Sequence, residues 1–152
     1  MKKLIILSDT HGNVSAMEQV LSIMKESDYV IHLGDCTADI LLYKRDLSEK
    51  LYSVSGNCDG GGCDLVLDID GLKILLTHAD RYGVKSGLER LMFKAKEQGV
   101  DAVFYGHTHQ ASIDVCDGIT FINPGSMARF GERSYCYAVI TNKKIIAKIV
   151  YF

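Results

Sequence analysis

The sequence has no hydrophobic run long enough to cross a membrane. A transmembrane helix needs about 20 consecutive apolar residues, and the apolar runs here are short, such as LIIL near the start. The segment SDTHG after that run is not a small-residue cleavage site. We therefore expect neither a membrane partner nor a secretory signal.

The chain also has little excess charge of either sign. It carries 17 Lys and Arg against 19 Asp and Glu, for a formal net charge of −2. The basic residues are scattered rather than clustered, so nothing indicates an electrostatic surface for long nucleic acid or an anionic membrane.

Only one proline, Pro124, is present, and no repeat or low-complexity tract interrupts the chain. We therefore expect a single domain over residues 1–152. The five cysteines are odd in number and irregularly spaced, which favours reduced thiols and a cytoplasmic protein. Cys58 and Cys63, in the stretch GNCDGGGCD, do not suggest a zinc or redox pair, because better oxygen and nitrogen ligands stand elsewhere.

Short apolar, β-branched runs alternate with helical patterns in the first two thirds of the chain. The patterns predict helices over 14–25, 38–43 and 85–98, with Asn13 capping the first. Strands are predicted over 4–7, 29–33, 51–54, 65–69, 73–77, 102–105, 112–115, 119–122, 135–140 and 145–151. The order of elements indicates an α/β fold that ends in a β meander.

Metal-ligating residues follow the α/β-type strands, at the point where each strand ends. If the strands run parallel, their carboxyl ends meet at one edge of a sheet. This edge would then assemble Asp9, His11, Asp35, Asn57, His78, His107 and His109. Two carboxylates, one amide oxygen and four imidazoles suit Mn, Fe, Zn, Co or Ni rather than Cu(I). Seven side chains are too many for one ion with open positions, but suit two ions that share a carboxylate.

Other polar residues are expected to have different roles. His32 lies inside VIHLG and is expected to be buried, where it would orient a ligand. Four aspartates are expected to be solvated turn residues: Asp59, Asp64, Asp68 and Asp70.

The blocks DTH, GD, GN, H and GHTH, followed by NPGS at 123–126, resemble the calcineurin-like metallophosphoesterase superfamily. They are most similar to its small bacterial and archaeal phosphodiesterases. The resemblance implies a four-layer α-β-β-α sandwich of two mixed sheets with a dinuclear metal centre. It also implies how the ligands divide: Asp9, His11 and His109 on the first ion, Asn57, His78 and His107 on the second, and Asp35 bridging both.

The activity implied by the resemblance is that of a metal-dependent phosphoric diester hydrolase. A hydroxide bridging two divalent ions would attack phosphorus in line, next to Asp35, Asn57 and His107. Manganese is the first expectation for both ions, with Fe, Ni, Co and Zn as alternatives. The expected partner is a small phosphodiester or nucleotide-like substrate, and the oligomeric state, including a homo-oligomer, stays open.

Two positions depart from the pattern of the family. Cys58 stands where many members have a histidine that protonates the leaving group, so substrates with good leaving groups, or another acid, are expected. The sequence His78-Ala79-Asp80 replaces the usual His-Gly-His. We expect Asp80 to orient a solvent molecule or a ligand near the second ion.

Two other functions remain open. The resemblance extends to a retromer subunit of the same fold that serves in protein assembly, so a catalytically weak scaffold is one alternative. A phosphomonoesterase or a nucleotide pyrophosphatase with the same ions is the other. Every ligand position of the family is retained, which favours catalysis over the scaffold.

Overall fold

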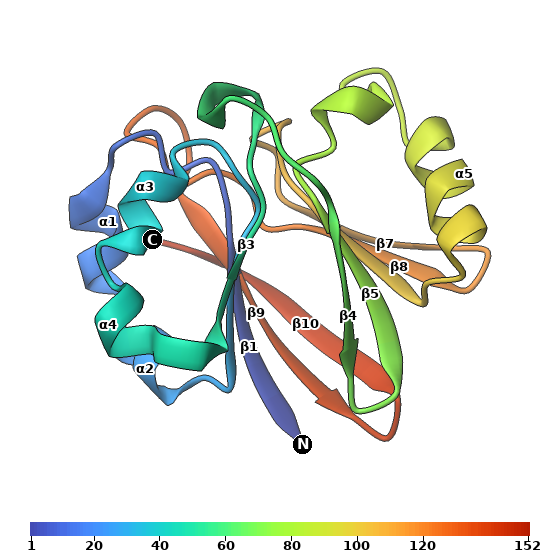
Figure 1. The fold of residues 1–152 in the computed structure, drawn as a ribbon, viewed down its shortest axis with the longest axis horizontal. Coiled ribbons are helices and arrows are strands. Elements are labelled where there is room, and N and C mark those ends of the chain that lie inside the picture. The colour runs from blue at the N-terminus through green and yellow to red at the C-terminus, as the bar shows by residue number, and fades with distance from the viewer.

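The computed structural model of the protein describes residues 1–152 and contains two five-stranded mixed sheets (Figure 1). The first sheet has the order β10-β9-β1-β2-β3 and the second the order β4-β5-β6-β8-β7. The strands of the first sheet are β1 (Lys2–Leu7), β2 (Tyr29–His32), β3 (Leu51–Ser53), β9 (Ser134–Thr141) and β10 (Lys144–Tyr151). Those of the second are β4 (Leu65–Ile69), β5 (Leu72–Thr77), β6 (Ala102–Tyr105), β7 (Ser112–Cys116) and β8 (Ile119–Asn123).

Each sheet has a parallel centre and antiparallel neighbours. Strands β1, β2 and β3 run parallel, as do β5, β6 and β8. The strands β9, β4 and β7 pair antiparallel with their neighbours. The carboxyl ends of each parallel set therefore lie at the same edge of their sheet, and the single edge considered from the sequence is replaced by one edge in each of two sheets.

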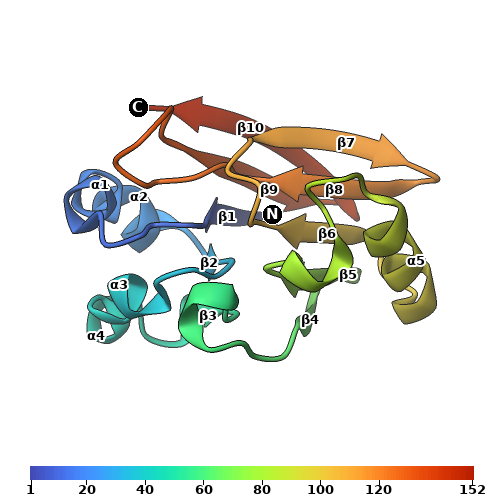
Figure 2. The ribbon, with the colours of Figure 1, turned by 90° about the horizontal axis from the view of Figure 1, so that it is seen from above.

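Helices cover the outer side of each sheet (Figures 1 and 2). Beside the first sheet lie α1 (Val14–Gln19), α2 (Leu21–Glu26), α3 (Thr37–Leu41) and α4 (Lys44–Leu47), and beside the second lies α5 (Glu89–Gln98). Short 3-10 turns occur at η1 (Ser48–Lys50), η2 (Asn57–Asp59) and η3 (Asp80–Tyr82). The expected α-β-β-α sandwich of two mixed sheets is confirmed. The longest helix, α5, has ten residues, and none has the length and apolar character to cross a membrane.

The central core lies between the two sheets. It joins side chains of the first sheet, such as Leu4 and Ile31, to side chains of the second, such as Ile74 and Phe104. Alternate residues of β1 point the other way, so Ile5 packs in a second cluster with α1 and α2. Strand β1 is therefore buried on both faces, which explains its unbroken apolar run. One core is shared by both sheets, although the single-domain organisation stays a prediction.

Two predicted helices differ from the structure. The pattern over 14–25 is divided at Val20 into α1 and α2, although Asn13 does cap the start by accepting a hydrogen bond from the Ala16 N–H. The pattern over 85–98 becomes helical only at Glu89. Gly87 has φ +140°, which a helix cannot accommodate, so the segment before Glu89 forms turns.

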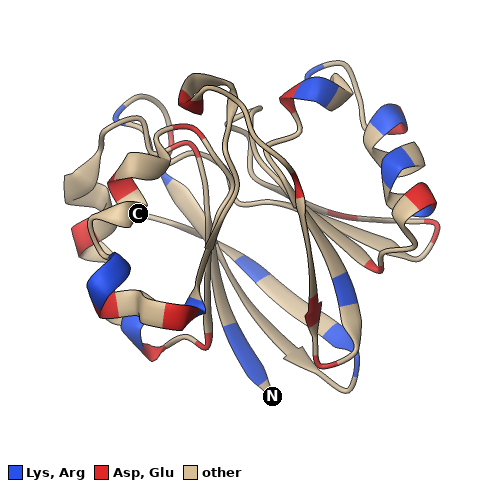
Figure 3. Ribbon diagram, in the orientation of Figure 1, with Lys and Arg blue, Asp and Glu red and all other residues tan.

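Charged residues of both signs occur on α4 and α5, and acidic segments lie in loops at the upper end of the first sheet (Figure 3). These loops follow the carboxyl ends of the parallel strands. The acidic side chains there need compensation by cations or by hydrogen-bond donors.

The shared core should dominate stability. Replacing Phe104, which is completely buried between the sheets, by alanine should lower the free energy of unfolding by about 3–5 kcal/mol in urea denaturation. The matched control is Phe93→Ala on α5, whose side chain is 71% exposed and whose loss should cost under about 0.5 kcal/mol. Equal small losses for both variants would contradict the central role of the core between the sheets.

Candidate metal centre

The seven predicted ligands come together where the upper edges of the two sheets meet. Loops of the first sheet contribute four of them: Asp9 and His11 after β1, Asp35 after β2 and Asn57 after β3. Loops of the second sheet contribute His78 after β5, and His107 and His109 after β6. The packing of the sheets against each other thus brings two halves of one site together.

One group of donor atoms comes from Asp9, His11, His109 and Asp35, and these atoms lie within 4.8 Å of one another. His109 Nε2 is 3.2 Å from Asp9 Oδ1 and 3.3 Å from His11 Nε2. Asp35 Oδ2 lies 3.6 Å from His11 Nε2. Two nitrogens and two carboxylate oxygens therefore surround one point.

A second group lies beside the first and is centred on His78. Its Nε2 is 3.0 Å from Asn57 Oδ1, 3.2 Å from His107 Nδ1 and 3.4 Å from Asp35 Oδ2. Asp35 Oδ2 thus belongs to both groups, while Asp35 Oδ1 accepts a hydrogen bond of 2.9 Å from the Cys58 N–H. One oxygen of this carboxylate is anchored to the protein and the other faces both groups.

The spacing of these atoms fits cations between them. Ligands about 2.1 Å from an ion in tetrahedral or octahedral geometry lie about 3.0–3.4 Å apart, close to the separations found here. Asp9 supplies a second observation, because its Oδ1 is fully buried and makes no well-aligned hydrogen bond within the protein. A buried carboxylate oxygen without a partner is rare and costly, and a cation would satisfy it.

Contacts behind the donor atoms fix their orientation. His78 Nδ1 donates to the Leu33 carbonyl oxygen at 2.8 Å, which directs Nε2 towards the other donor atoms. Asp9 Oδ2 accepts from the Ser8 hydroxyl and from the His107 N–H, so only Oδ1 is available to a ligand. Both residues present a single defined atom to the centre.

Burial and neighbouring charges shift the pKa values of three of the predicted ligands in different directions. Burial alone would raise the pKa of Asp9, but the adjacent His109 and Ser8 lower it below the ordinary value. Burial, together with the neighbouring His78, lowers the pKa of His107, which favours the neutral ring that a metal ion binds. Contact with Asp9 raises the pKa of His109, so a proton competes more strongly with a metal ion for this ring.

Five of the seven residues have an uncommon backbone conformation. Asp9, His11, Asp35, His107 and His109 all have φ between 43° and 74°, in the left-handed region. This region costs a non-glycine residue roughly 1–2 kcal/mol and concentrates at functional sites. The surrounding fold therefore imposes a conformation that these residues would not adopt alone.

The glycines that precede ligands allow the loops to approach one another. A Cβ on Gly56 would collide with the Asp35 carboxylate, and a Cβ on Gly106 would collide with the Ser8 hydroxyl. In each of the pairs Gly56-Asn57 and Gly106-His107, the second residue is a predicted ligand. The glycine before it lacks a side chain, which lets a neighbouring loop pack closely.

Cys58 and Asp80 occupy the rim of the centre. The Cys58 backbone holds Asp35, while its thiol is exposed and lies 3.8 Å from Asn57 Nδ2. Asp80 opens η3 and is close enough to raise the pKa of His107, although burial and His78 outweigh this effect. The catalytic contributions expected of Cys58 and Asp80 stay predictions.

Asp59 was predicted to be a solvated turn residue, and that prediction was wrong. Its carboxylate accepts hydrogen bonds from four backbone N–H groups, including those of Asp35 and Gly56. An aspartate three residues after a glycine that opens a tight turn is a recognisable signal for such capping.

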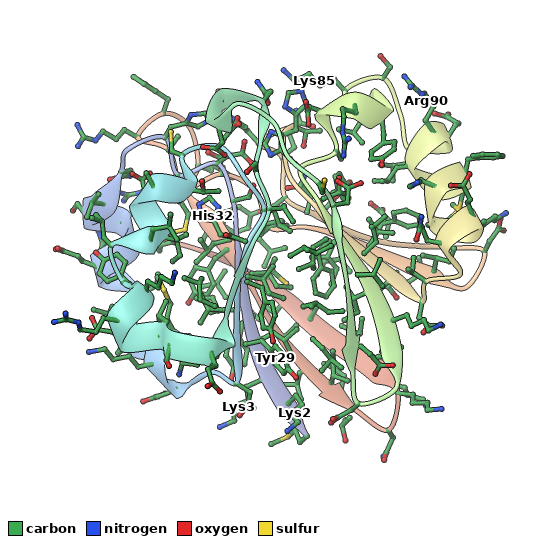
Figure 4. The ribbon with its side chains drawn as sticks, in the orientation of Figure 1. Lys2, Lys3, Tyr29, His32, Lys85 and Arg90 are labelled. Carbon is green, nitrogen blue, oxygen red and sulfur yellow. The ribbon has the colours of Figure 1, made fainter.

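His32 is completely buried, as expected, and lies beside α3 (Figure 4). Its Nδ1 accepts from the Gly34 N–H at 3.1 Å, so Nε2 carries the proton and donates to Thr10 Oγ1 at 3.1 Å. Thr10 in turn donates to Asp39 Oδ2 at 2.7 Å. This chain of bonds connects β2 to the loop that carries Asp9 and His11.

Burial lowers the pKa of His32 from 6.5 to about 4. Between these values the unfolded chain binds a proton that the folded protein does not, so stability is lost as the pH falls from about 6.5 towards 4. The contribution is on the order of 3 kcal/mol. In urea denaturation of the metal-free protein, His32→Gln should lose less stability over this range than the wild type. The other histidines are common to both proteins and cancel, and parallel curves would contradict the assignment.

Comparisons with known proteins identify the family of this chain. The model of the calcineurin-like phosphoesterase superfamily domain matches residues 1–144. The probable metallophosphoesterase YsnB of Bacillus subtilis is 32% identical over 154 residues, covering 97% of this chain and 89% of its own length. Phosphodiesterase MJ0936 of Methanocaldococcus jannaschii is 28% identical over 143 residues, covering 81% of this chain and 82% of its own.

A solved structure extends the agreement to three dimensions. The crystal structure of a protein from Streptococcus pneumoniae TIGR4, described as a predicted phosphoesterase, superimposes with a TM-score of 0.82 at 27% identity. The alignment covers 99% of this chain and 89% of that one. The match over nearly the whole chain confirms the resemblance seen in the motifs: this protein belongs to the calcineurin-like phosphoesterase superfamily.

Proposed function

We propose that the protein is a phosphodiesterase that hydrolyses small phosphodiesters at the candidate metal centre. The observation that carries this proposal is the position of Asp35 Oδ2, which is 3.6 Å from a donor atom of the first group and 3.4 Å from one of the second. A carboxylate oxygen in this position suits a pair of ions rather than two separate ones. The proposal is supported by MJ0936, a relative that is named as a phosphodiesterase.

The two groups of donor atoms define which residues would hold the ions. Asp9, His11 and His109 would hold the first, Asn57, His78 and His107 the second, and Asp35 both. Two divalent ions of the manganese type would act as Lewis acids, lowering the pKa of water and polarising a phosphoester. Asn57 and the four histidines contribute donors without charge, so the ligands carry only the two negative charges of Asp9 and Asp35.

This charge balance favours an anionic substrate. Two divalent ions bring four positive charges against the two carboxylates, so the occupied centre keeps a net positive charge that attracts a phosphodiester anion. An aspartate in place of Asn57 would reduce this excess by one charge.

The open side of the centre suits a diester. The side chains of His109 and His11 are 45% and 30% exposed, and Asn57 and Cys58 lie at the surface. A diester carries a second alcohol group that must project away from the reacting phosphorus, and the exposed side leaves room for it. Since a cysteine rather than a histidine follows Asn57, substrates with acidic leaving alcohols should react fastest.

Metal removal and substrate comparison test the proposal together. Protein treated with EDTA and dialysed should not hydrolyse bis(p-nitrophenyl) phosphate, and added Mn²⁺ should restore turnover. The value of kcat/KM should be higher for this diester than for p-nitrophenyl phosphate. Activity that survives complete metal removal would exclude the mechanism. A preference for the monoester would favour a phosphomonoesterase, and two bound ions without any turnover would favour a scaffold.

Asp35→Asn tests the shared carboxylate. The change removes a negative charge from both groups of donors at nearly constant shape, so kcat should fall at least about 100-fold and at least one ion should be lost. Steady-state kinetics and elemental analysis of the purified protein measure the two effects. The control, Asp114→Asn, removes an exposed charge on β7 and should behave like the wild type. Wild-type turnover by Asp35→Asn would refute the bridging role.

A further inference from the structure

Asp59 holds two ligand-bearing loops with a single carboxylate. Its Oδ2 accepts hydrogen bonds from the N–H groups of Asp35 at 2.8 Å and Gly56 at 2.9 Å. Its Oδ1 accepts from the N–H groups of Cys36 at 2.8 Å and Thr37 at 3.1 Å. Both loops carry residues of the candidate metal centre. The loop after β2 contains Asp35, and in the loop after β3 Gly56 immediately precedes Asn57.

The number of these bonds shows that Asp59 is not itself a metal ligand. An ionised carboxylate offers about four lone-pair sites, and four N–H donors occupy them all. Asp9 differs sharply, because its Oδ1 is buried without a partner and faces the centre. The carboxylate of Asp59 therefore acts on the backbone behind the ligands.

The loop after β2 presents a concave surface that an anion fills. Asp35 and Cys36 are consecutive non-glycine residues with φ of 62° and 65°. Successive N–H groups in such a turn point to one side and form an anion-binding hollow. The carboxylate of Asp59 occupies this hollow, and hydrogen bonds of this kind stabilise a backbone conformation that is unfavourable by itself.

A bond in the opposite direction completes the connection between the loops. Asp35 Oδ1 accepts from the Cys58 N–H at 2.9 Å, so each loop binds the backbone of the other through an aspartate. We name this arrangement the carboxylate clasp, formed by residues 35–37 and 56–59. The clasp leaves Asp35 Oδ2 and Asn57 Oδ1 free, and these are the two oxygens of the second group of donor atoms.

We propose that Asp59 is a positioning residue that sets the separation between Asp35 and Asn57 and so completes the second metal site. The proposal rests on the proposed function for the identity of that site. The second group takes two of its four donors, Asp35 and Asn57, from the clasp, whereas the first takes only Asp35. Loss of Asp59 should therefore weaken binding of the second ion more than binding of the first.

Asp59→Asn and Asp59→Ala test this assignment in the absence of substrate. Asparagine keeps the shape of the side chain but offers one acceptor oxygen in place of two, and its amide N–H₂ would face backbone N–H donors. Alanine removes the side-chain acceptors altogether. The control is Asp70→Asn, which removes a charge from the exposed turn between β4 and β5 and keeps a residue that tolerates the φ of 51° found there.

Metal binding by the full-length apoprotein is the main measurement. Titration with Mn²⁺ in a calorimeter should show two binding steps for the wild type and for Asp70→Asn. In the Asp59 variants one of the two steps should lose about 10–100-fold in affinity, while the other changes less. Titration with Co²⁺ gives a spectroscopic readout, because the visible bands of the second ion should change. Two wild-type steps in a folded Asp59 variant would overturn the proposal.

The wild-type protein provides a test that does not depend on a variant folding. In the apoprotein the amides of Asp35, Cys36, Thr37 and Gly56 should exchange with deuterium at least about tenfold more slowly than unbonded loop amides. Exchange as fast as in free loops would overturn the clasp. Neither measurement uses a phosphoester, so wild-type protein that binds two ions without turnover would refute only the proposed activity.

Discussion

The carboxylate of Asp35 is the group on which the rest of the centre depends. Its Oδ1 is held by the Cys58 N–H, and its Oδ2 lies between two groups of donor atoms. A carboxylate held at one oxygen cannot rotate to serve one group alone. The position of this one side chain therefore decides whether the remaining six form one site or two unrelated ones.

Asp35 also depends on how the two sheets pack. The first sheet carries Asp9, His11, Asp35 and Asn57, and the second carries His78, His107 and His109. No direct covalent link fixes one edge relative to the other. The apolar core between the sheets does so instead, together with a few polar bonds such as His78 Nδ1 to the Leu33 carbonyl oxygen and the His107 N–H to Asp9. Stability and activity are thus coupled, because a shift of one sheet would move half of the donors.

Much of this arrangement could be read from the sequence. Polar residues after consecutive strands indicated that the ligands gather at strand ends, because parallel strands end together, although the expected single edge proved to be the adjoining edges of two sheets. The start of α5 could not be read, since Val84 and Leu88 keep helical spacing and pack in the same cluster as Leu91 without being helical. The spacing of apolar residues indicates which side chains are buried. The conformation of the backbone between them depends on residues such as Gly87, whose positive φ prevents a helix.

Asp59 shows why a motif alone does not reveal what each carboxylate does. Asp9, Asp35 and Asp59 all lie in loops at the same edge, and their sequence neighbours would suit either a ligand or a turn. Counting hydrogen-bond donors separates them: Asp59 has four, Asp35 Oδ1 has one and Asp9 Oδ1 has none. A carboxylate surrounded by N–H groups gains nothing from a cation, while a buried oxygen without donors is stabilised only by one. The protein therefore uses the same side chain in two ways, and the backbone around each one, rather than its place in the sequence, determines which.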